Sequence, residues 1–201
     1  MILYLHGFRS SPASFKAQQL AKTFAALGLE QRWVCPQLPA SPAEAMRLCH
    51  ELVNAHQKAM PEAELVIMGS SLGGYYATYL AEHYQARCVV LNPVVYAARD
   101  LMQHVGTHQH YHSDTPFYFL NHYLDELEAL ATRKPVDPQR YYLLACTGDE
   151  VLDWQEMAAW YEGSHGQIIE GGDHSISDFP SYQSEIVDFV LNTHAPAKPS
   201  H

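Results

Sequence analysis

The sequence contains few basic residues and no long apolar run. Lys and Arg number 12 against 22 Asp and Glu, which gives a formal net charge of −10 with His neutral. Such an acidic surface repels phosphate groups, so we expect neither nucleic acid nor an anionic lipid surface as a partner. The longest apolar runs have only a few residues, far too few for a membrane span.

Cysteine is also scarce, and the N-terminal residues lack the features of a secretory signal. The four cysteines, Cys35, Cys49, Cys88 and Cys146, form no closely spaced pair, and three of them lie in or beside apolar runs. Free cysteine in such surroundings behaves as a small buried apolar residue. The N-terminal MILYLHGF has no basic segment, and its apolar segment is too short for a signal peptide. We therefore expect a reduced, cytoplasmic protein.

Nothing in the composition divides the chain into parts. Apolar residues make up 47% of the 201 residues, and no internal repeat is present. A chain of this length and composition suits one domain with a hydrophobic core, which we predict over residues 1–194. The remaining residues, 195–201, have no apolar anchor, and we predict that this C-terminal tail is disordered.

Short apolar runs alternate with amphipathic segments along the chain. Six runs predict strands covered on both faces, because most of them are continuously apolar. They cover residues 2–5, 32–35, 64–68, 87–91, 140–146 and 166–170. Helices are predicted at residues 14–28 and 41–60, after Leu72, and near residues 153–163 and 181–194. The helix at 41–60 opens with the capping box Ser41-x-x-Glu44, which predicts Ser41 as its N-cap. This alternation predicts a compact three-layer α/β fold, with a largely parallel sheet of about six strands and helices on both faces.

One long stretch, residues 96–135, interrupts the alternation after the fourth strand. It is longer than an ordinary crossover loop, and FLNHYLDELEALA within it has a helical pattern. Long insertions in compact domains are usually lids or binding loops, so we predict a cap over a pocket.

The segment 104–112 within this insertion is rich in histidine. It contains His104, His108, His110 and His112, with Asp114 nearby. Histidine is a common ligand of zinc and nickel, so a metal site is one interpretation. We expect no metal, because no cysteine or acidic ligand spacing frames the cluster.

The segment GSSLG, residues 69–73, fits the pattern G-x-S-x-G with Ser71 in the centre. It follows an apolar run and precedes a helical pattern, the context in which this motif marks a nucleophile on a strained turn. The helix N-terminus favours negative charge, and the N–H of Leu72 is placed to donate to an oxyanion. Ser70 is the weaker candidate because it occupies the variable position. An ordinary turn rich in Gly and Ser is the alternative.

A second oxyanion donor is expected in LHGFRSSP, at the end of the first predicted strand. In α/β-hydrolases a His-Gly segment at this place supplies an oxyanion N–H, which here belongs to Phe8. We interpret His6 as a core histidine bonded to the backbone. Arg9 is either a residue at the mouth of the site, facing an anionic part of the substrate, or an ordinary exposed arginine.

The acid and the base follow the nucleophile along the chain in this fold. TGDEVLD, after the fifth strand, offers Asp149, Glu150 and Asp153 as the acid. We predict Asp149, because Asp153 begins a D-x-x-E helix start and is expected to be an N-cap; Asp153 remains the alternative. Glu150 is expected to point to solvent. His174, in GGDHSISDF after the sixth strand, is the predicted general base.

Five motifs together cover nearly the whole chain: YLHGFRSSP, GSSLGGYYATYLAE, LNPVV, TGDEVLD and GGDHSISDF. This set resembles the small bacterial YqiA-type esterase family of the α/β-hydrolase fold. The resemblance implies a triad of Ser71, Asp149 and His174, and hydrolysis of simple carboxylic esters, with acyl-CoA thioesters also cleaved in the family. Residues 96–124 depart from the family pattern.

We therefore predict a serine hydrolase that cleaves small carboxylic esters or acyl thioesters through an acyl-enzyme on Ser71, with no cofactor. The predicted substrate-binding residues are Arg9, Tyr96 and Phe117. The predicted assembly is a monomer or a small homo-oligomer. One alternative is an acyl-CoA thioesterase specifically. The other is a catalytically silent hydrolase fold that serves as a binding protein.

Overall fold

The computed structural model describes residues 1–111 and 115–191, so the predicted tail, His112 and Asp114 lie outside the described residues. Its main sheet has six strands in the order β2-β1-β3-β4-β7-β8, and all neighbouring pairs are parallel. The strands are β1 (Ile2–Leu5), β2 (Trp33–Val34), β3 (Val66–Ser70), β4 (Arg87–Leu91), β7 (Tyr141–Cys146) and β8 (His165–Ile169). The predicted α/β fold with a parallel six-stranded sheet is confirmed.

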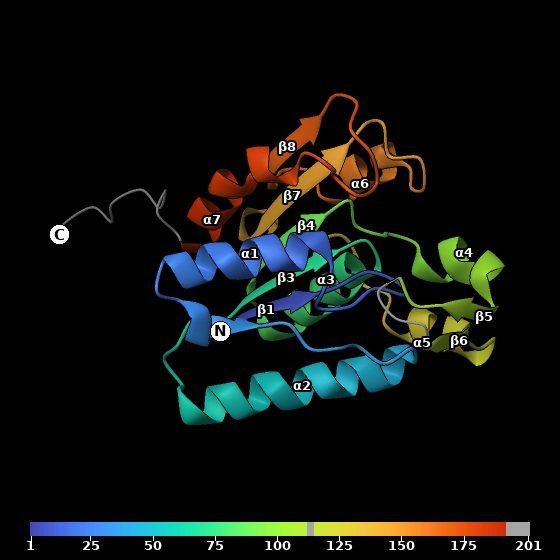
Figure 1. Ribbon diagram of the computed structural model, residues 1–201, viewed down its shortest axis with the longest axis horizontal. Coiled ribbons are helices and arrows are strands. Elements are labelled where there is room, and N and C mark those ends of the chain that lie inside the picture. Colours follow the sequence, from blue (N-terminus) through green and yellow to red (C-terminus); the bar gives the residue numbers. More distant parts are fainter. Residues whose placement is uncertain (112–114, 192–201) are drawn as a thin grey trace.

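Helices lie on both faces of this sheet, which gives three layers (Figure 1). The α-helices are α1 (Phe15–Ala26), α2 (Pro42–Ala59), α3 (Leu72–Tyr84), α4 (Ala97–Leu101), α5 (His122–Ala129), α6 (Trp154–Trp160) and α7 (Gln183–Leu191). Short 3-10 turns are η1 (Glu30–Arg32), η2 (Met102–His104), η3 (Pro138–Arg140) and η4 (Phe179–Ser181). Helices α1 and α7 pack on one face, and α2, α3 and α6 pack on the other.

The strands are continuously apolar because their alternate residues enter two different cores. Tyr4 and Met68 point to the face covered by α1 and α7, where Phe24 packs. Leu3 and Ile67 point to the opposite face, against α2 and α3. Successive side chains of a strand leave it on opposite sides, so a sheet covered twice needs apolar residues at every position.

At the start of two helices, a side chain accepts a hydrogen bond from a backbone N–H of the first turn that has no partner within the helix. Ser41 Oγ accepts from the N–H of Glu44 at 3.2 Å, and Pro42 occupies the first position of α2. Asp153 Oδ1 accepts from the N–H of Gln155 at 2.8 Å and precedes α6. Both predicted N-caps are confirmed, and each stabilises its helix by about 1 kcal/mol.

The insertion between β4 and β7 contains α4, α5 and an antiparallel hairpin of β5 (Gly106–Gln109) and β6 (Pro116–Phe119). The predicted helix within it is α5. The hairpin was not predicted, although Phe117 and Phe119 are buried and the intervening Tyr118 is exposed, which is the alternation of a half-buried strand.

The insertion packs firmly on the main body. Glu126 of α5 accepts from Ser41 Oγ at 2.7 Å and from the N–H of Ala43 at 3.0 Å, so it joins α5 to the start of α2. The Tyr75 hydroxyl of α3 donates to the carbonyl of Leu127 at 2.7 Å. These contacts fix α5 on the main body, and Figure 1 shows α4, α5 and the hairpin together on the side toward which the carboxyl end of β1 points.

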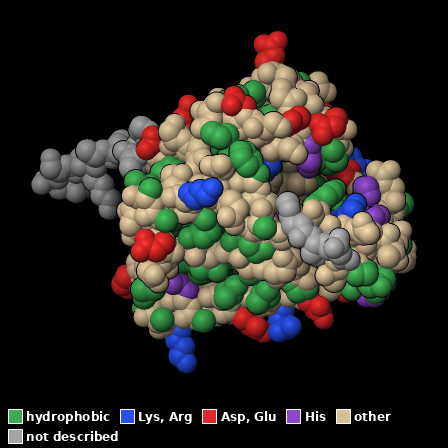
Figure 2. All heavy atoms as spheres, in the orientation of Figure 1, with side chains coloured by type: hydrophobic (Ala, Val, Ile, Leu, Met, Phe, Trp, Pro, Cys, Tyr) green, Lys and Arg blue, Asp and Glu red, His purple; other side chains and the backbone are tan. Residues whose placement is uncertain are grey.

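The surface and the cysteines agree with the composition. Acidic side chains lie at several places around the face in Figure 2, and the hydrophobic ones form small groups between them. All four cysteines are free, and three are buried. Within residues 1–111 and 115–191, no helix is both long and apolar enough to cross a bilayer.

Helix α3 begins so close to β1 that its second residue must lack a side chain. A Cβ built on Gly73 would lie 2.0 Å from the carbonyl oxygen of Leu5, and backbone atoms cannot give way as a flexible side chain does. This contact sets the distance between the start of α3 and the sheet.

We expect Gly73→Ala to prevent folding or to lower the free energy of unfolding by about 3 kcal/mol or more, because the clash is with backbone. Gly28→Ala is the matched control: Gly28 has a φ of 70° but nothing within 4 Å of its built Cβ. Its cost is about 1 kcal/mol, from the left-handed backbone alone. Urea denaturation measures both, and equal costs for the two variants would contradict the packing argument.

Candidate active site

The predicted site residues gather at the carboxyl edge of the parallel sheet. Phe8 follows β1, Ser71 follows β3, Asp149 follows β7 and His174 follows β8. In open parallel sheets the loops at this edge form the ligand crevice. The topology therefore brings together four segments that are far apart in the sequence.

Ser71 lies on a strained turn between β3 and α3. Its φ is 54° and its ψ is −124°, a conformation that non-glycine residues rarely adopt and that costs about 1–3 kcal/mol. Backbone hydrogen bonds hold the turn: the Ser71 N–H donates to Leu91 O at 3.0 Å, and Ser71 O accepts from the N–H groups of Gly74 and Val94 at 2.9 and 3.1 Å. The strain is thus maintained by the strand and helix on either side.

Ser71, His174 and Asp149 form one chain of hydrogen bonds. His174 Nε2 lies 3.0 Å from Ser71 Oγ, and His174 Nδ1 lies 2.8 Å from Asp149 Oδ2. The Asp149 side chain is 0% exposed, and its other oxygen accepts from the N–H groups of Val151 and Leu152 at 2.8 and 2.9 Å. A carboxylate with three donors is fixed in place, so Nδ1 carries the proton and Nε2 is left to accept from the serine.

The other candidate residues have different contacts. Asp153 caps α6, as described above, and Ser70 is buried with its hydroxyl bonded to the Tyr4 hydroxyl. Glu150 is exposed, as expected, and its Oε2 also accepts from the backbone N–H of His174 at 2.9 Å. This contact supports the histidine loop and was not predicted, since no local pattern shows it.

Phe8 lies in the loop after β1 and Leu72 begins α3, and these two segments meet at Ser71. A Cβ built on Gly7 would lie 3.2 Å from Ser71 Cβ, so the β1 loop passes directly over the serine. Leu72 is the first residue of α3, whose first-turn N–H groups have no partner within the helix. Across residues 1–111 and 115–191, neither the Phe8 nor the Leu72 N–H donates to another protein group.

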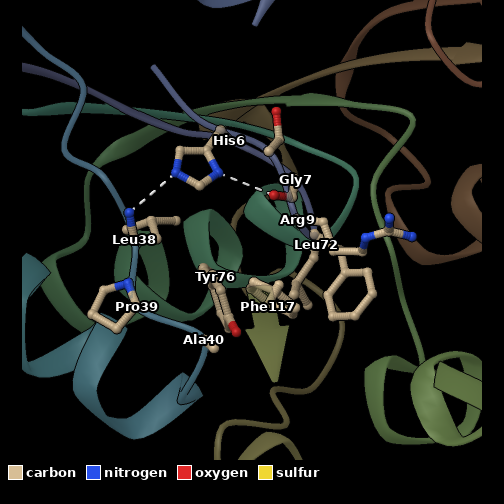
Figure 3. Close-up of a pocket in the computed structure, with 11 residues that line it drawn as sticks. His6, Gly7, Arg9, Leu38, Pro39, Ala40, Leu72, Tyr76 and Phe117 are labelled. Carbon is tan, nitrogen blue, oxygen red and sulfur yellow. Dashed lines mark hydrogen bonds between the residues drawn. The ribbon is translucent and has the colours of Figure 1, made fainter. Parts of the chain in front are cut away.

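His6 is buried and bonded to the backbone, as predicted. Its Nε2 accepts from the N–H of Leu38 at 3.1 Å, and its Nδ1 donates to the carbonyl of Gly7 at 3.0 Å (Figure 3). It joins the β1 loop to the segment before α2 and keeps both fixed.

Two cavities lie beside the β1 loop. The smaller has a volume of about 20 Å³, room for a single water molecule, and Phe8, Leu72, Tyr76 and Phe117 are among its walls. The larger has a volume of about 750 Å³ and lies between the segment before α2 and the hairpin. Leu38, Pro39, Ala40 and Phe117 line both cavities, so the two are adjacent. Ser71 itself lines neither.

The three predicted substrate-binding residues have different surroundings. Phe117 is buried and lines both cavities. Arg9 lines the smaller one, but its guanidinium points away from the other walls (Figure 3); its Nε donates to Gln109 O at 2.7 Å and it stacks over Tyr111. Tyr96 lines neither cavity, because its ring packs on Trp160 at a centroid distance of 5.7 Å.

The half-buried ring of Phe8 packs against the insertion. It contacts the rings of His104, His108, Phe117 and Phe119 at centroid distances of 5.1 to 5.9 Å. Burial, followed by the nearby His108 and Arg9, lowers the pKa of His104 and favours its neutral form. The described residues contain no group of three or more His, Cys, Asp or Glu that could hold a metal ion.

Lys16 of α1 supports the histidine loop from the other side. Its Nζ donates to the carbonyl of Ser175 at 2.6 Å. Burial lowers the pKa of Lys16 to about 8, although Asp173 opposes the shift. Asp173 accepts from both the N–H and the hydroxyl of Ser177, which lowers the pKa of its carboxyl.

The arrangement of sheet, turn and strand-end loops is that of the α/β-hydrolase fold, and solved structures share it. Est1E from Butyrivibrio proteoclasticus, solved with ferulic acid bound, is 12% identical with a TM-score of 0.70, covering 95% of this chain and 88% of its own. Mouse alpha/beta hydrolase domain-containing protein 10 is 16% identical with a TM-score of 0.66, and the match covers 94% of this chain and 90% of the mouse chain. A monoacylglycerol lipase from Paleococcus ferrophilus is 15% identical with a TM-score of 0.66, and the match covers 95% of this chain and 93% of the lipase chain. At these identities the likeness establishes the fold.

The chain belongs to the uncharacterised protein family UPF0227, whose model matches residues 1–191. This is the YqiA family, so the family indicated by the five sequence motifs is confirmed.

The Lys16 site predicts a pH dependence of stability. Between pH 8 and 10.5 the unfolded chain retains a proton that folded Lys16 has released, so this group makes the free energy of unfolding rise with pH. We expect the difference between wild type and Lys16→Met to grow in favour of wild type from pH 7.5 to 9.5, by up to about 1.4 kcal/mol per pH unit.

Urea denaturation at several pH values measures this difference. Lys22→Met is the matched control, because Lys22 lies on the exposed side of the same helix. A difference that stays flat for Lys16→Met, or that changes as strongly for Lys22→Met, contradicts the assignment to the buried lysine.

Proposed function

We propose that this protein is a serine hydrolase that cleaves carboxylic esters, with acyl thioesters as a related substrate class, through an acyl-enzyme on Ser71. The observation that carries the proposal is the chain of hydrogen bonds from Asp149 through His174 to Ser71, at 2.8 and 3.0 Å. A nucleophile, a base within reach of it and a third group that orients the base together define nucleophilic catalysis.

In the proposed first step, Ser71 Oγ attacks the substrate carbonyl and its proton passes to His174 Nε2. Asp149 holds the imidazole in the required tautomer and stabilises the imidazolium that forms. His174 then protonates the leaving alcohol or thiol, and the acyl group remains on Ser71. Water, deprotonated by the same histidine, attacks the acyl-enzyme and releases the carboxylic acid.

The N–H groups of Phe8 and Leu72 are the proposed oxyanion donors. Both flank Ser71, and neither is engaged elsewhere in the described protein. Donors held by strand ends need no reorganisation when charge develops on the carbonyl oxygen, and each is worth about 10²-fold or more in kcat.

The larger cavity is the proposed site of the acyl group. Its volume of about 750 Å³ falls in the range of small-molecule pockets. Among the described residues that line it there is no Asp, Glu, Lys or Arg, and its walls include Pro12, Pro116, Phe117 and Tyr118. Such walls favour an uncharged, apolar group. The monoacylglycerol lipase from P. ferrophilus, with the same fold, is by its name an enzyme that acts on an ester.

The strain at Ser71 argues against a silent binding protein. A left-handed serine costs stability and persists only where the surrounding structure enforces it, and such strain gathers at functional sites. A binding protein gains nothing from an aligned base and a buried, fully bonded carboxylate.

The first test compares Ser71→Ala with Ser70→Ala on p-nitrophenyl esters from acetate to palmitate and on acyl-CoA thioesters. We expect Ser71→Ala to lower kcat by about 10⁴-fold or more, because it removes the nucleophile. Ser70→Ala changes the neighbouring hydroxyl, which bonds to Tyr4, and is expected to cost less than about tenfold. Steady-state rates at saturating substrate measure both.

Labelling of the wild type by a fluorophosphonate probe tests the nucleophile without a substrate. We expect labelling at Ser71 alone, mapped by mass spectrometry. Absence of labelling together with absence of turnover of any ester or thioester would overturn the proposal in favour of a binding protein.

The second test assigns the acid. Asp149→Asn leaves the wrong tautomer facing Ser71, so we expect a loss of about 10³- to 10⁴-fold in kcat. Asp153→Asn retains a good N-cap and is expected to cost less than about tenfold. The two variants are compared by kcat at one pH and by thermal melts; a larger loss for Asp153→Asn would make Asp153 the acid.

A further inference from the structure

Asn92 is a buried polar residue at the end of β4 that the proposed reaction does not use. It is 0% exposed, and its φ of 40° lies in the left-handed region, which Asn tolerates better than most residues. Its N–H donates to the carbonyl of Leu144 in β7 at 2.8 Å. Burying an amide side chain is costly unless its hydrogen bonds are made, so its partners explain its presence.

The side chain of Asn92 bonds to the segments that carry the base and the acid. Its Nδ2 donates to the carbonyls of Asp173 and His174 at 3.0 and 3.1 Å. Its Oδ1 accepts from the N–H of Cys146, the last residue of β7, at 2.8 Å. The Asp149 N–H in turn donates to the carbonyl of Cys146 at 3.2 Å. One amide therefore joins the histidine loop to the turn that holds the acid.

The residue before Asn92 completes the connection. The carbonyl of Leu91 accepts from the N–H of Ser71 at 3.0 Å. Leu91 and Asn92, two successive residues, therefore bond to the backbone of Ser71, of His174 and of the last residue of β7. The other contacts of the histidine loop are nearer to solvent: Glu150 is exposed, and Lys16 is only partly buried. Of these side chains that bond to the histidine loop, Asn92 is the one most shielded from water.

We propose that Asn92 is a positioning residue, whose amide holds the backbone of His174 so that the imidazole lies between Ser71 and Asp149 before substrate binds. The inference rests on the proposed function, in which His174 exchanges a proton with Ser71. Because the two reacting atoms are 3.0 Å apart, a shift of the loop by about 1 Å removes the alignment and costs about a hundredfold in rate.

Two variants test the amide without disturbing the backbone. Asn92→Asp keeps the acceptor for Cys146 and the tolerance for left-handed φ, but it replaces the donor with an oxygen that faces two carbonyls. Asn92→Gly adopts a positive φ without cost and removes the side chain alone. Asn54→Asp makes the same chemical change on the exposed side of α2, where Asn54 Oδ1 accepts from the Tyr84 hydroxyl, and is the matched control.

Both Asn92 variants are expected to lower kcat on p-nitrophenyl esters by about ten- to hundredfold, with KM within about twofold of wild type. The rates are measured at temperatures where thermal melts show that the variants are folded. Asn54→Asp leaves both constants at the wild-type values. A folded Asn92→Gly with wild-type kcat, or a loss confined to melting temperature, would overturn the inference.

A proton NMR measurement separates this inference from the proposed function. The His174 Nδ1–H, hydrogen-bonded to Asp149, gives a downfield resonance that His174→Gln identifies by its loss. We expect folded Asn92→Asp and Asn92→Gly to lose or broaden this resonance. If wild type turns over no ester or thioester while both variants lose the resonance, the positioning role stands and the proposed function fails; a resonance unchanged in both variants means that Asn92 does not position His174.

Discussion

The close packing of β1 against the start of α3 is the constraint on which the rest of the site depends. Gly73 leaves no room for a side chain beside Leu5, and this contact turns the chain sharply at Ser71. The turn brings the serine under the β1 loop, and that loop supplies Phe8. We expect a looser contact to separate Ser71 from the proposed oxyanion donors, although every residue of the site would still be present.

The proposed base and acid, His174 and Asp149, are held by a different kind of contact. Their strands, β7 and β8, end next to one another in the sheet, and the two side chains lie in the loops that follow. Asn92 reaches from the end of β4 to the histidine loop and to Cys146, the last residue of β7, and Asp149 is fixed by the N–H groups of its own turn. The proposed nucleophile is thus held by backbone packing and backbone hydrogen bonds, whereas the proposed base depends on the Asn92 amide and the proposed acid on N–H groups of its own turn.

Sequence patterns predicted those parts of the structure that local chemistry decides. Continuous apolar runs located the six strands, and the N-caps Ser41 and Asp153 marked helix starts. The sequence does not predict the hairpin β5–β6, because its strands have four residues each and β5 is mostly polar. The contacts of Asn92 and Glu150 are not predicted either, because no local pattern shows them. The partners of Asn92 lie 81 and 82 positions away along the chain, and that of Glu150 lies 24 positions away. Tyr96 was placed at a pocket from its position alone, whereas packing on Trp160 turns its ring elsewhere.

Phe8 belongs to two parts of the molecule at once, because it directly follows Gly7, which lies against Ser71, while its half-buried ring packs among aromatic side chains of the insertion. The insertion therefore cannot be exchanged like a detachable lid. A relative that acquires a different hairpin must refit the environment of this ring, and any error is transmitted to the backbone beside the serine. In the proposed reaction, a change in the walls of the pocket and a change in the rate at Ser71 are therefore coupled through Phe8.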